Sequence, residues 1–321
     1  MNQRYNYKAP GNRSVSAPGG VQLKDIRKQL PLRVLSESDF EFWRAWGYVI
    51  IPNAVDAKQV QAVQSLLWEF TEMDPKDAAT WSKPQLRQHE MKELNNSGMV
   101  ECYHHQALWD SRQTQRVYNA FVDIWDREDL WVTIDRANLN TPNRDGRQFS
   151  GFIHWDADST MNPPPIGVQG VLALSDTDEH CGGFQCVPQL FHDFERWKQS
   201  QPAGRDPWVP DLTGYEPEFI PMRAGDLLIF NSLLAHGIRP NRSDRVRMAQ
   251  YISMAPADES DEEMRQWRVT SWREHTPPQG FAFPGDPREW EKTRYPQAQL
   301  TPLGEKLLGL KSWRESRVEL A

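Results

Sequence analysis

The sequence predicts an α+β protein in which several helices precede many short strands that close into a double-stranded β-helix, or jelly-roll, barrel. Two capped helical stripes occur before residue 75, and short apolar runs separated by turn residues begin at Leu130. No internal repeat of 20 to 50 residues is visible. At 321 residues the chain is long enough to bury a large core around a cavity.

The composition favours a globular enzyme or binding protein over a nucleic-acid or membrane protein. Charged residues make up 25% of the chain, hydrophobic residues 38%, and the net charge is −7. This balance gives no electrostatic reason to expect nucleic acid or an anionic membrane as partner. No apolar run approaches the ~20 residues that cross a bilayer, and the three cysteines lack C-x-x-C spacing. We therefore expect a cytoplasmic protein with reduced thiols and a small-molecule substrate; the pattern does not indicate an oligomeric state.

The N-terminal part divides into a polar arm and a first helix. Residues 1–34 lack hydrophobic periodicity and are expected to form a flexible or loosely draped arm, followed by one domain over 35–321. Ser36 to Asp39 begin a short helix that carries apolar Phe42, Trp43 and Trp46 and ends at Gly47. The next four residues, Tyr48–Ile51, predict a strand closed by Pro52.

Two further helices are expected before the strands. The first starts at Asp56, with Gln59 as capping-box partner, and has an apolar stripe of Val60, Val63, Leu67 and Phe70. The second is expected from about Ser111 to Trp125. The stretch between them, roughly 74–108, is polar and irregular, and its length makes it a candidate lid over a pocket.

From Leu130 onward, six short apolar runs predict strands. They read WVTIDRANL, FSGFIHW, VQGVLAL, GGFQCVP, FIPMRAGDLLIF and RMAQYISMA. A polar C-terminal extension follows from about residue 256, and Thr301 and Pro302 begin a short helix whose leucines are expected to dock on the barrel.

One run carries a pair of residues that could bind a metal. His154 and Asp156 in GFIHWDADST are one residue apart, so on a strand both side chains would point to the same face. A pair of this kind is expected by chance alone in a chain of this composition, and two ligands do not hold a metal. His236, after the apolar run LLIFNSLLA, is the candidate third ligand. Two histidines and one carboxylate leave open positions that suit non-haem Fe(II) and oxygen chemistry.

The residues after His236 supply a candidate anion-binding group. Residues 240–244 have turn composition, so we expect the chain to reverse and Arg247 to begin a strand beside the one that carries His236. A guanidinium there could bind a carboxylate through two hydrogen bonds. Arg245 has the same strand parity, so alternation does not distinguish it from Arg247.

The segments HWDAD, GVQGVLALSDTDEHCGGFQCVP and GDLLIFNSLLAHGIRPNRSDRVRMA together resemble the phytanoyl-CoA dioxygenase (PhyH-like) family of Fe(II)/2-oxoglutarate-dependent oxygenases. The resemblance covers about residues 36–255. It implies a cupin-like jelly roll, iron held by His154, Asp156 and His236, and the far carboxylate of 2-oxoglutarate held by the arginine eleven residues after the second histidine, Arg247. O2 is the implied second cosubstrate, with ascorbate as a supporting reductant.

The chain departs from the family pattern at two places. Where the family commonly has Pro-Gly-Ser-His, residues 188–192 read PQLFH, and Ile238 replaces a hydroxylated residue often found two places after the second histidine. Gln169 and Asn138, on the strands flanking the first motif, could supply polar contacts to the cosubstrate instead. Both departures concern the pocket and leave the proposed ligands in place.

The resemblance predicts hydroxylation of an unactivated C–H bond of a small organic molecule, with release of succinate and CO2. The sequence does not identify the substrate or a coenzyme A binding surface. Two other functions fit the same ligands: a metal-binding jelly roll without catalysis, and a zinc hydrolase that activates water. Arg247 favours the oxygenase, because hydrolysis has no need for a carboxylate clamp near the metal.

Overall fold

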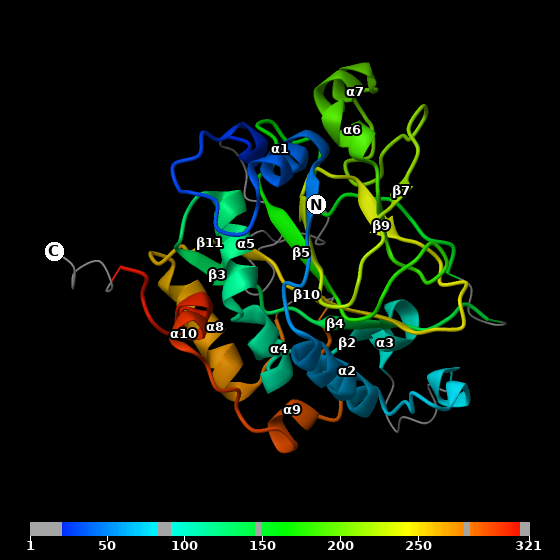
Figure 1. The fold of residues 1–321 in the computed structure, drawn as a ribbon, viewed down its shortest axis with the longest axis vertical. Coiled ribbons are helices and arrows are strands. Elements are labelled where there is room, and N and C mark those ends of the chain that lie inside the picture. The colour runs from blue at the N-terminus through cyan, green and yellow to red at the C-terminus, as the bar shows by residue number, and fades with distance from the viewer. Residues whose placement is uncertain (1–20, 83–90, 145–148, 279–282, 315–321) are drawn as a thin grey trace.

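The computed structural model of the protein describes residues 21–82, 91–144, 149–278 and 283–314 (Figure 1). Its first elements match the sequence predictions. Helix α1 (Glu37–Trp46) has a reciprocal capping box between Ser36 and Asp39 and ends at Gly47, whose φ of 79° is the left-handed conformation that glycine adopts without strain. Strand β1 (Tyr48–Ile51) follows directly.

Helix α2 (Ala57–Thr71) has the predicted capping box between Asp56 and Gln59, and the predicted apolar stripe is buried. The predicted start of the third helix, at about Ser111, was wrong. The structure divides it into α4 (Gln106–Arg112) and α5 (Gln115–Trp125), because Thr114 takes an extended conformation between them.

The stretch predicted to be irregular, 74–108, contains secondary structure. It forms the 3₁₀ helix η2 (Ala78–Ser82), helix α3 (Lys92–Ser97), strand β2 (Met99–Val100) and the beginning of α4. These elements are too short for periodicity to reveal them. Part of the candidate lid, 83–90, lies outside the described residues.

The later strands form three antiparallel sheets. A six-stranded sheet has the order β1-β8-β5-β10-β4-β2, a three-stranded sheet the order β7-β6-β9, and β11 pairs with β3. The bounds of these strands are β3 (Leu130–Val132), β4 (Ala137–Asn140), β5 (Val168–Ala173), β6 (Phe184–Cys186), β7 (Glu218–Phe219), β8 (Leu227–Asn231), β9 (His236–Ile238), β10 (Arg247–Tyr251) and β11 (Met254–Pro256).

The two larger sheets face each other across an apolar layer. Phe184 of β6 and Phe230 of β8 lie in this layer with ring centroids 5.0 Å apart, and Trp155 is fully buried there. The opposite face of the six-stranded sheet is covered by helices that include α2, α4 and α5, which form a second core with it (Figure 1). Two opposed antiparallel sheets beside a helical layer confirm the predicted α+β jelly-roll fold.

Several strand predictions were wrong in detail. WVTIDRANL and RMAQYISMA each divide into two strands that join different sheets. The run FSGFIHW forms no extended strand; His154 makes an isolated bridge with His236. His236 does not end the strand after Gly225-Asp226, because β8 stops at Asn231 and His236 begins β9 in the other sheet. Arg247 therefore does not lie beside the strand of His236; β10 pairs with β4 and β5.

Helices missed by the sequence prediction flank the barrel. The segment with PQLFH forms α6 (Pro188–His192), and α7 (Phe194–Ser200) follows. In the C-terminal extension, α8 (Glu262–Glu274) and α9 (Trp290–Thr293) precede the predicted helix α10 (Pro302–Leu308), whose Leu307 and Leu308 are buried. Helix α8 is polar along most of its length, so it lacked the apolar periodicity on which the prediction depended.

The described part of the predicted arm, 21–34, lies against α5. After η1 (Leu23–Asp25), the backbone N–H groups of Arg33, Val34 and Leu35 donate to the carboxylate of Asp123 at 2.8–2.9 Å. Residues 1–20 lie outside the described residues.

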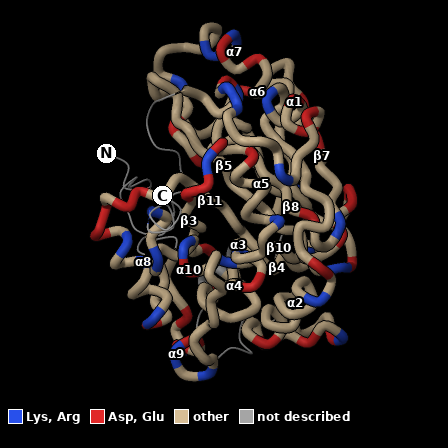
Figure 2. Tube along the Cα trace, turned by 60° about the vertical axis from the view of Figure 1, so that its left-hand side comes forward, with Lys and Arg blue, Asp and Glu red and all other residues tan. Residues whose placement is uncertain are grey.

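Basic and acidic residues are interspersed over the described trace (Figure 2). Among the described residues, no helix is both long and apolar enough to span a membrane.

Candidate metal centre

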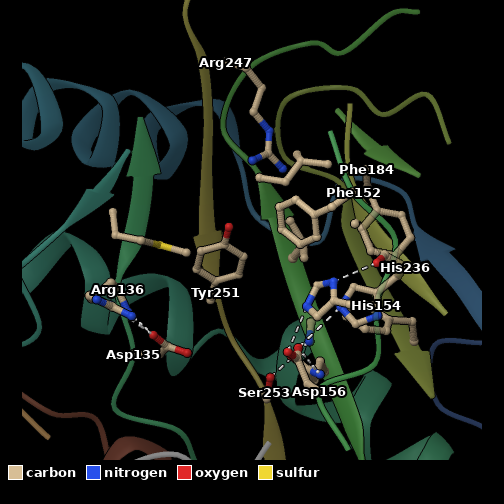
Figure 3. Close-up of a pocket in the computed structure, with 17 residues that line it drawn as sticks. Asp135, Arg136, Phe152, His154, Asp156, Phe184, His236, Arg247, Tyr251 and Ser253 are labelled. Carbon is tan, nitrogen blue, oxygen red and sulfur yellow. Dashed lines mark hydrogen bonds and ion pairs between the residues drawn. The ribbon is translucent and has the colours of Figure 1, made fainter. Parts of the chain in front are cut away.

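The three predicted ligands meet although they come from distant segments. His154 and Asp156 lie in the loop between β4 and β5, and His236 begins β9. The backbones of His154 and His236 exchange two N–H···O bonds, at 2.8 and 2.9 Å. One ligand atom of each of the three side chains lies within 4.8 Å of the others (Figure 3). A single ion could therefore contact all three side chains.

Gly237 permits this backbone approach. A Cβ at position 237 would lie 1.8 Å from the carbonyl oxygen of Phe152, which is closer than any side chain tolerates. The glycine next to His236 thus lets the 152–154 segment lie against β9 and brings the two imidazoles together.

The hydrogen bonds of the imidazoles orient them for metal binding. Nδ1 of His154 lies 3.0 Å from the carbonyl oxygen of His236, and Nδ1 of His236 lies 2.9 Å from that of Leu234. A carbonyl oxygen only accepts, so both Nδ1 atoms carry hydrogen and both Nε2 atoms remain for another partner. Such backbone bonds are the usual way in which proteins fix metal-binding histidines.

The remaining nitrogens both face the carboxylate of Asp156. Nε2 of His154 lies 3.0 Å from Oδ1, and Nε2 of His236 lies 3.4 Å from Oδ2. A neutral Nε2 and a carboxylate oxygen repel each other unless a proton or a metal cation lies between them. The donor set and its orientation therefore fit a divalent cation such as Fe(II).

The electrostatics of the cluster agree with this fit. Burial raises the pKa of the Asp156 carboxyl, but the hydrogen bonds from His154 and His236 outweigh it and hold that pKa well below its usual range. Burial lowers the pKa of the His154 imidazole, and the bond to Asp156 reverses this, so the net shift is upward. The site thus favours an ionised carboxylate with positive charge beside it.

A cavity of about 220 Å³ opens from this cluster. Aromatic rings form the wall next to the histidines: Phe184 stacks on His236 with centroids 5.7 Å apart, and Phe152 lies 4.7 Å from the ring of His154. Met99, from the predicted lid stretch, and Ile238 line the cavity as well. Apolar walls of this kind exclude water from the space beside the metal position.

The structure distinguishes Arg247 from Arg245. The side chain of Arg245 is half exposed and pairs with Asp178 on the surface. Arg247 is 4% exposed and lines the cavity (Figure 3). Its Nη1 makes one long hydrogen bond, 3.4 Å to Oδ1 of Asn138, and its Nε is buried without a hydrogen-bond partner among the described residues. A buried guanidinium with spare donors is suited to an incoming carboxylate.

Gln169 and Asn138 contact other site residues. Nε2 of Gln169 donates to Oδ2 of Asp156 at 2.9 Å, and Gln169 lines the cavity. Asn138 is fully buried behind Arg247, and its Nδ2 donates to the carbonyl oxygen of Ser97 at 2.8 Å. The sequence predicted polar contacts to the cosubstrate from both; in the structure Gln169 contacts Asp156 and Asn138 contacts Arg247.

Sequence reasoning missed four polar residues that line the cavity: Asp135, Arg136, Tyr251 and Ser253. Tyr251 is four residues after Arg247 on β10, so strand parity would have found it. An adjacent acid and base inside the apolar run WVTIDRANL was the available signal for Asp135 and Arg136.

Two curated proteins and one solved structure resemble this chain. A protein of Aspergillus versicolor, "Ava biosynthesis cluster protein O", is 26% identical over 67% of this chain and 76% of its own length. A Dictyostelium discoideum protein provisionally named a phytanoyl-CoA dioxygenase is 23% identical over 68% of this chain and 74% of its own. The crystal structure of a Candida albicans protein encoded by a GlcNAc-inducible gene shares the fold, with a TM-score of 0.61 at 13% identity over 85% of this chain and 76% of that one.

The sequence profile of one family matches most of the barrel. The profile "Phytanoyl-CoA dioxygenase (PhyH)" covers residues 43–249, which include all three candidate ligands and Arg247. The chain belongs to this family of Fe(II)/2-oxoglutarate-dependent oxygenases.

Proposed function

We propose that His154, Asp156 and His236 hold Fe(II), that Arg247 binds the far carboxylate of 2-oxoglutarate, and that the protein hydroxylates an unactivated C–H bond of a small organic molecule. Bound iron and 2-oxoglutarate would supply an oxidant made from O2, with decarboxylation of the cosubstrate to succinate and CO2. Ascorbate would keep the iron reduced.

One observation carries the proposal: a metal-competent triad and an under-paired buried arginine line the same cavity. The triad alone would also suit a zinc hydrolase. A guanidinium at 4% exposure with spare donors is costly in the absence of an anion, and a dicarboxylate cosubstrate explains it.

The residues of the chain contribute placement and exclusion of water. The carbonyl oxygens of His236 and Leu234 hold the two imidazoles in one tautomer, and Gln169 holds the carboxylate of Asp156. The rings of Phe152 and Phe184 shield the histidines. This arrangement keeps a reactive centre fixed against one position of the substrate.

The size of the cavity supports a small substrate. Its volume of about 220 Å³ lies below the ~300–1,000 Å³ of pockets that enclose drug-sized ligands. Cosubstrate and the reacting part of the substrate must share this space.

Succinate release tests the proposal. The purified protein is incubated with Fe(II), ascorbate, 2-oxoglutarate and O2, and succinate is measured with and without candidate substrates; we expect iron-dependent succinate. A protein that retains Zn(II) on purification and forms no succinate with any candidate would instead favour the hydrolase or the non-catalytic module.

An anaerobic Fe(II) titration tests the ligands separately from turnover. His236→Ala should lose iron retention because the cluster keeps only two ligands, whereas His180→Ala, at an exposed histidine outside the cavity, should bind iron as the wild type does. Unchanged iron affinity in His236→Ala would remove His236 from the ligand set.

We also propose a cytoplasmic location, supported by the three cysteines, which are buried and unpaired. The expectation of no nucleic-acid or membrane partner stays a prediction.

A further inference from the structure

The wall of the cavity opposite the metal cluster carries charged residues that the proposed chemistry does not use. Asp135 and Arg136, between β3 and β4, line the cavity together with Tyr251. Figure 3 shows Asp135 and Arg136 on the far side of the pocket from His154, Asp156 and His236, with Tyr251 between the two groups. A substrate lying over the metal would therefore extend toward this wall.

The guanidinium of Arg136 is already neutralised by the protein. Its Nη1 lies 2.5 Å from Oε1 of Glu101, and both side chains are buried. The other oxygen of Glu101 accepts from the hydroxyl of Tyr103 and, at 3.0 Å, from the N–H of Gly285. The ring of Phe283 covers the guanidinium at 4.3 Å. Arg136 is thus held in place and has its own counter-charge.

The carboxylate of Asp135 is less well satisfied. Its Oδ1 accepts the backbone N–H of Arg136 at 2.7 Å and lies 3.7 Å from Nε of that residue. Its Oδ2 receives no hydrogen bond from the described part of the chain, and 15% of the side chain is exposed at the cavity. Arg112 donates its hydrogen bond to the backbone carbonyl oxygen of Asp135, at 2.5 Å, and acts on the carboxylate through its charge. One carboxylate oxygen is therefore free to accept a bond from a ligand.

The charges inside the cavity suggest which ligand this is. Asp156 and a divalent iron leave one positive charge, Arg247 adds a second, and the two carboxylates of 2-oxoglutarate cancel both. Arg136 and Glu101 cancel each other. The negative charge of Asp135 is then only partly compensated: burial raises the pKa of its carboxyl and outweighs the guanidiniums of Arg136 and Arg112, which lower it, so the net shift is upward.

We propose that Asp135 is a specificity-determining residue that binds a protonated amino group of the substrate, whose apolar part lies against Phe152, Met99 and Ile238. The inference rests on the proposed function, because it is the occupied metal and cosubstrate positions that leave Asp135 as the under-compensated negative charge at the cavity. The substrate class it names is a small amine with an apolar body.

Calorimetric binding of three four-carbon probes tests this inference. Butylamine, 1-butanol and butanoate are titrated into Zn(II)-loaded protein, which does not turn over, with 2-oxoglutarate kept saturating so that butanoate does not occupy Arg247. Because charge-assisted hydrogen bonds are the stronger ones, we expect butylamine to bind about tenfold more tightly than 1-butanol, or about 1.4 kcal/mol, with butanoate weakest.

Variants locate the preference. Asp135→Asn keeps an acceptor for the N–H of Arg136 but removes the charge, so it should weaken butylamine about tenfold and change 1-butanol by less than about threefold. Asp211→Asn is the matched control, because Asp211 also accepts a backbone N–H, at 2.9 Å from Thr213, but is exposed and outside the cavity. Melting temperatures check folding, and Asp135→Ser replaces Asp135→Asn if the latter is unstable.

The inference is overturned if the wild type shows no butylamine binding, if 1-butanol or butanoate binds as tightly as butylamine, or if the amine preference survives in a folded Asp135 variant. The wild-type ranking decides alone if both variants fail to fold. If the amine preference holds and depends on Asp135 but the iron-loaded protein makes no succinate, the oxygenase proposal fails while this one stands. If succinate forms but the protein shows no amine preference, this inference fails while the oxygenase proposal stands.

Discussion

Replacing Arg247 with alanine should weaken 2-oxoglutarate far more than it weakens iron. The side chain is 4% exposed, and it interacts with two uncharged partners, Asn138 at 3.4 Å and Tyr251. In Arg247→Ala the far carboxylate of the cosubstrate would enter a buried position without its counter-charge. Loss of one partner of a buried ion pair costs roughly 3–5 kcal/mol, which corresponds to an affinity loss of about 10²- to 10³-fold or more.

Anaerobic calorimetry measures both affinities on the same preparation. Iron binding should be retained, because Arg247 is not one of the three candidate ligands and its hydrogen bond goes to Asn138. Arg245→Ala is the matched control: it lies two residues away with the same strand parity, yet its partner is Asp178 on the surface. Equal losses of iron and 2-oxoglutarate in Arg247→Ala, or an equal loss of 2-oxoglutarate in Arg245→Ala, would refute the assignment.

Arg247→Ala should also leave the ligand-free protein at least as stable as the wild type. A buried guanidinium without a carboxylate partner costs desolvation energy that alanine does not. Thermal melts without cosubstrate should therefore give Arg247→Ala a melting temperature no lower than that of the wild type, whereas added 2-oxoglutarate should raise the melting temperature of the wild type only.

Two further predictions concern a backbone contact and a buried carboxyl group. Gly237→Ala should abolish metal retention in the anaerobic titration, because its Cβ would meet the carbonyl oxygen of Phe152 at 1.8 Å, while Gly204→Ala, whose Cβ would meet nothing within 4 Å, should bind metal normally; normal metal affinity in folded Gly237→Ala would contradict the geometric argument. Glu291 accepts the backbone N–H groups of Tyr103 and His104, and burial raises the pKa of its carboxyl to about 7 despite these bonds. The folded state therefore holds this proton more tightly than the unfolded state, so this group's contribution to unfolding free energy should fall by about 3 kcal/mol as pH rises from 4.5 to 7 and then level off. Denaturant unfolding at several pH values should show that fall as the difference between the wild type and Glu291→Gln, and parallel pH profiles would rule it out.

Local features of the sequence predicted α1 and α2, whose ends are marked by capping residues. The capping boxes at Ser36 and Asp56 and the glycine at 47 act within a few residues, so the chain near them has one favourable conformation. Helix α8 and the split between α4 and α5 escaped prediction because contacts with the rest of the fold, and not a local apolar stripe, stabilise them.

The chemical types at the site were also readable from the sequence: two histidines and a carboxylate for a metal, and an arginine for a carboxylate. Which residues meet was decided by pairing across long separations. His154 and His236 are 82 residues apart, and backbone hydrogen bonds connect the loop of His154 to β9, which begins at His236. The sequence prediction had placed His236 at the end of the strand that is now β8. Arg245 and Arg247 have the same strand parity. Burial distinguishes them, because Arg245 pairs with Asp178 on the surface and Arg247 is buried in the cavity wall. Side-chain chemistry is a property of each residue, whereas its exposure and partners depend on how the sheets pack. Candidate metal ligands could therefore be named from the sequence, and the free carboxylate oxygen of Asp135 could not.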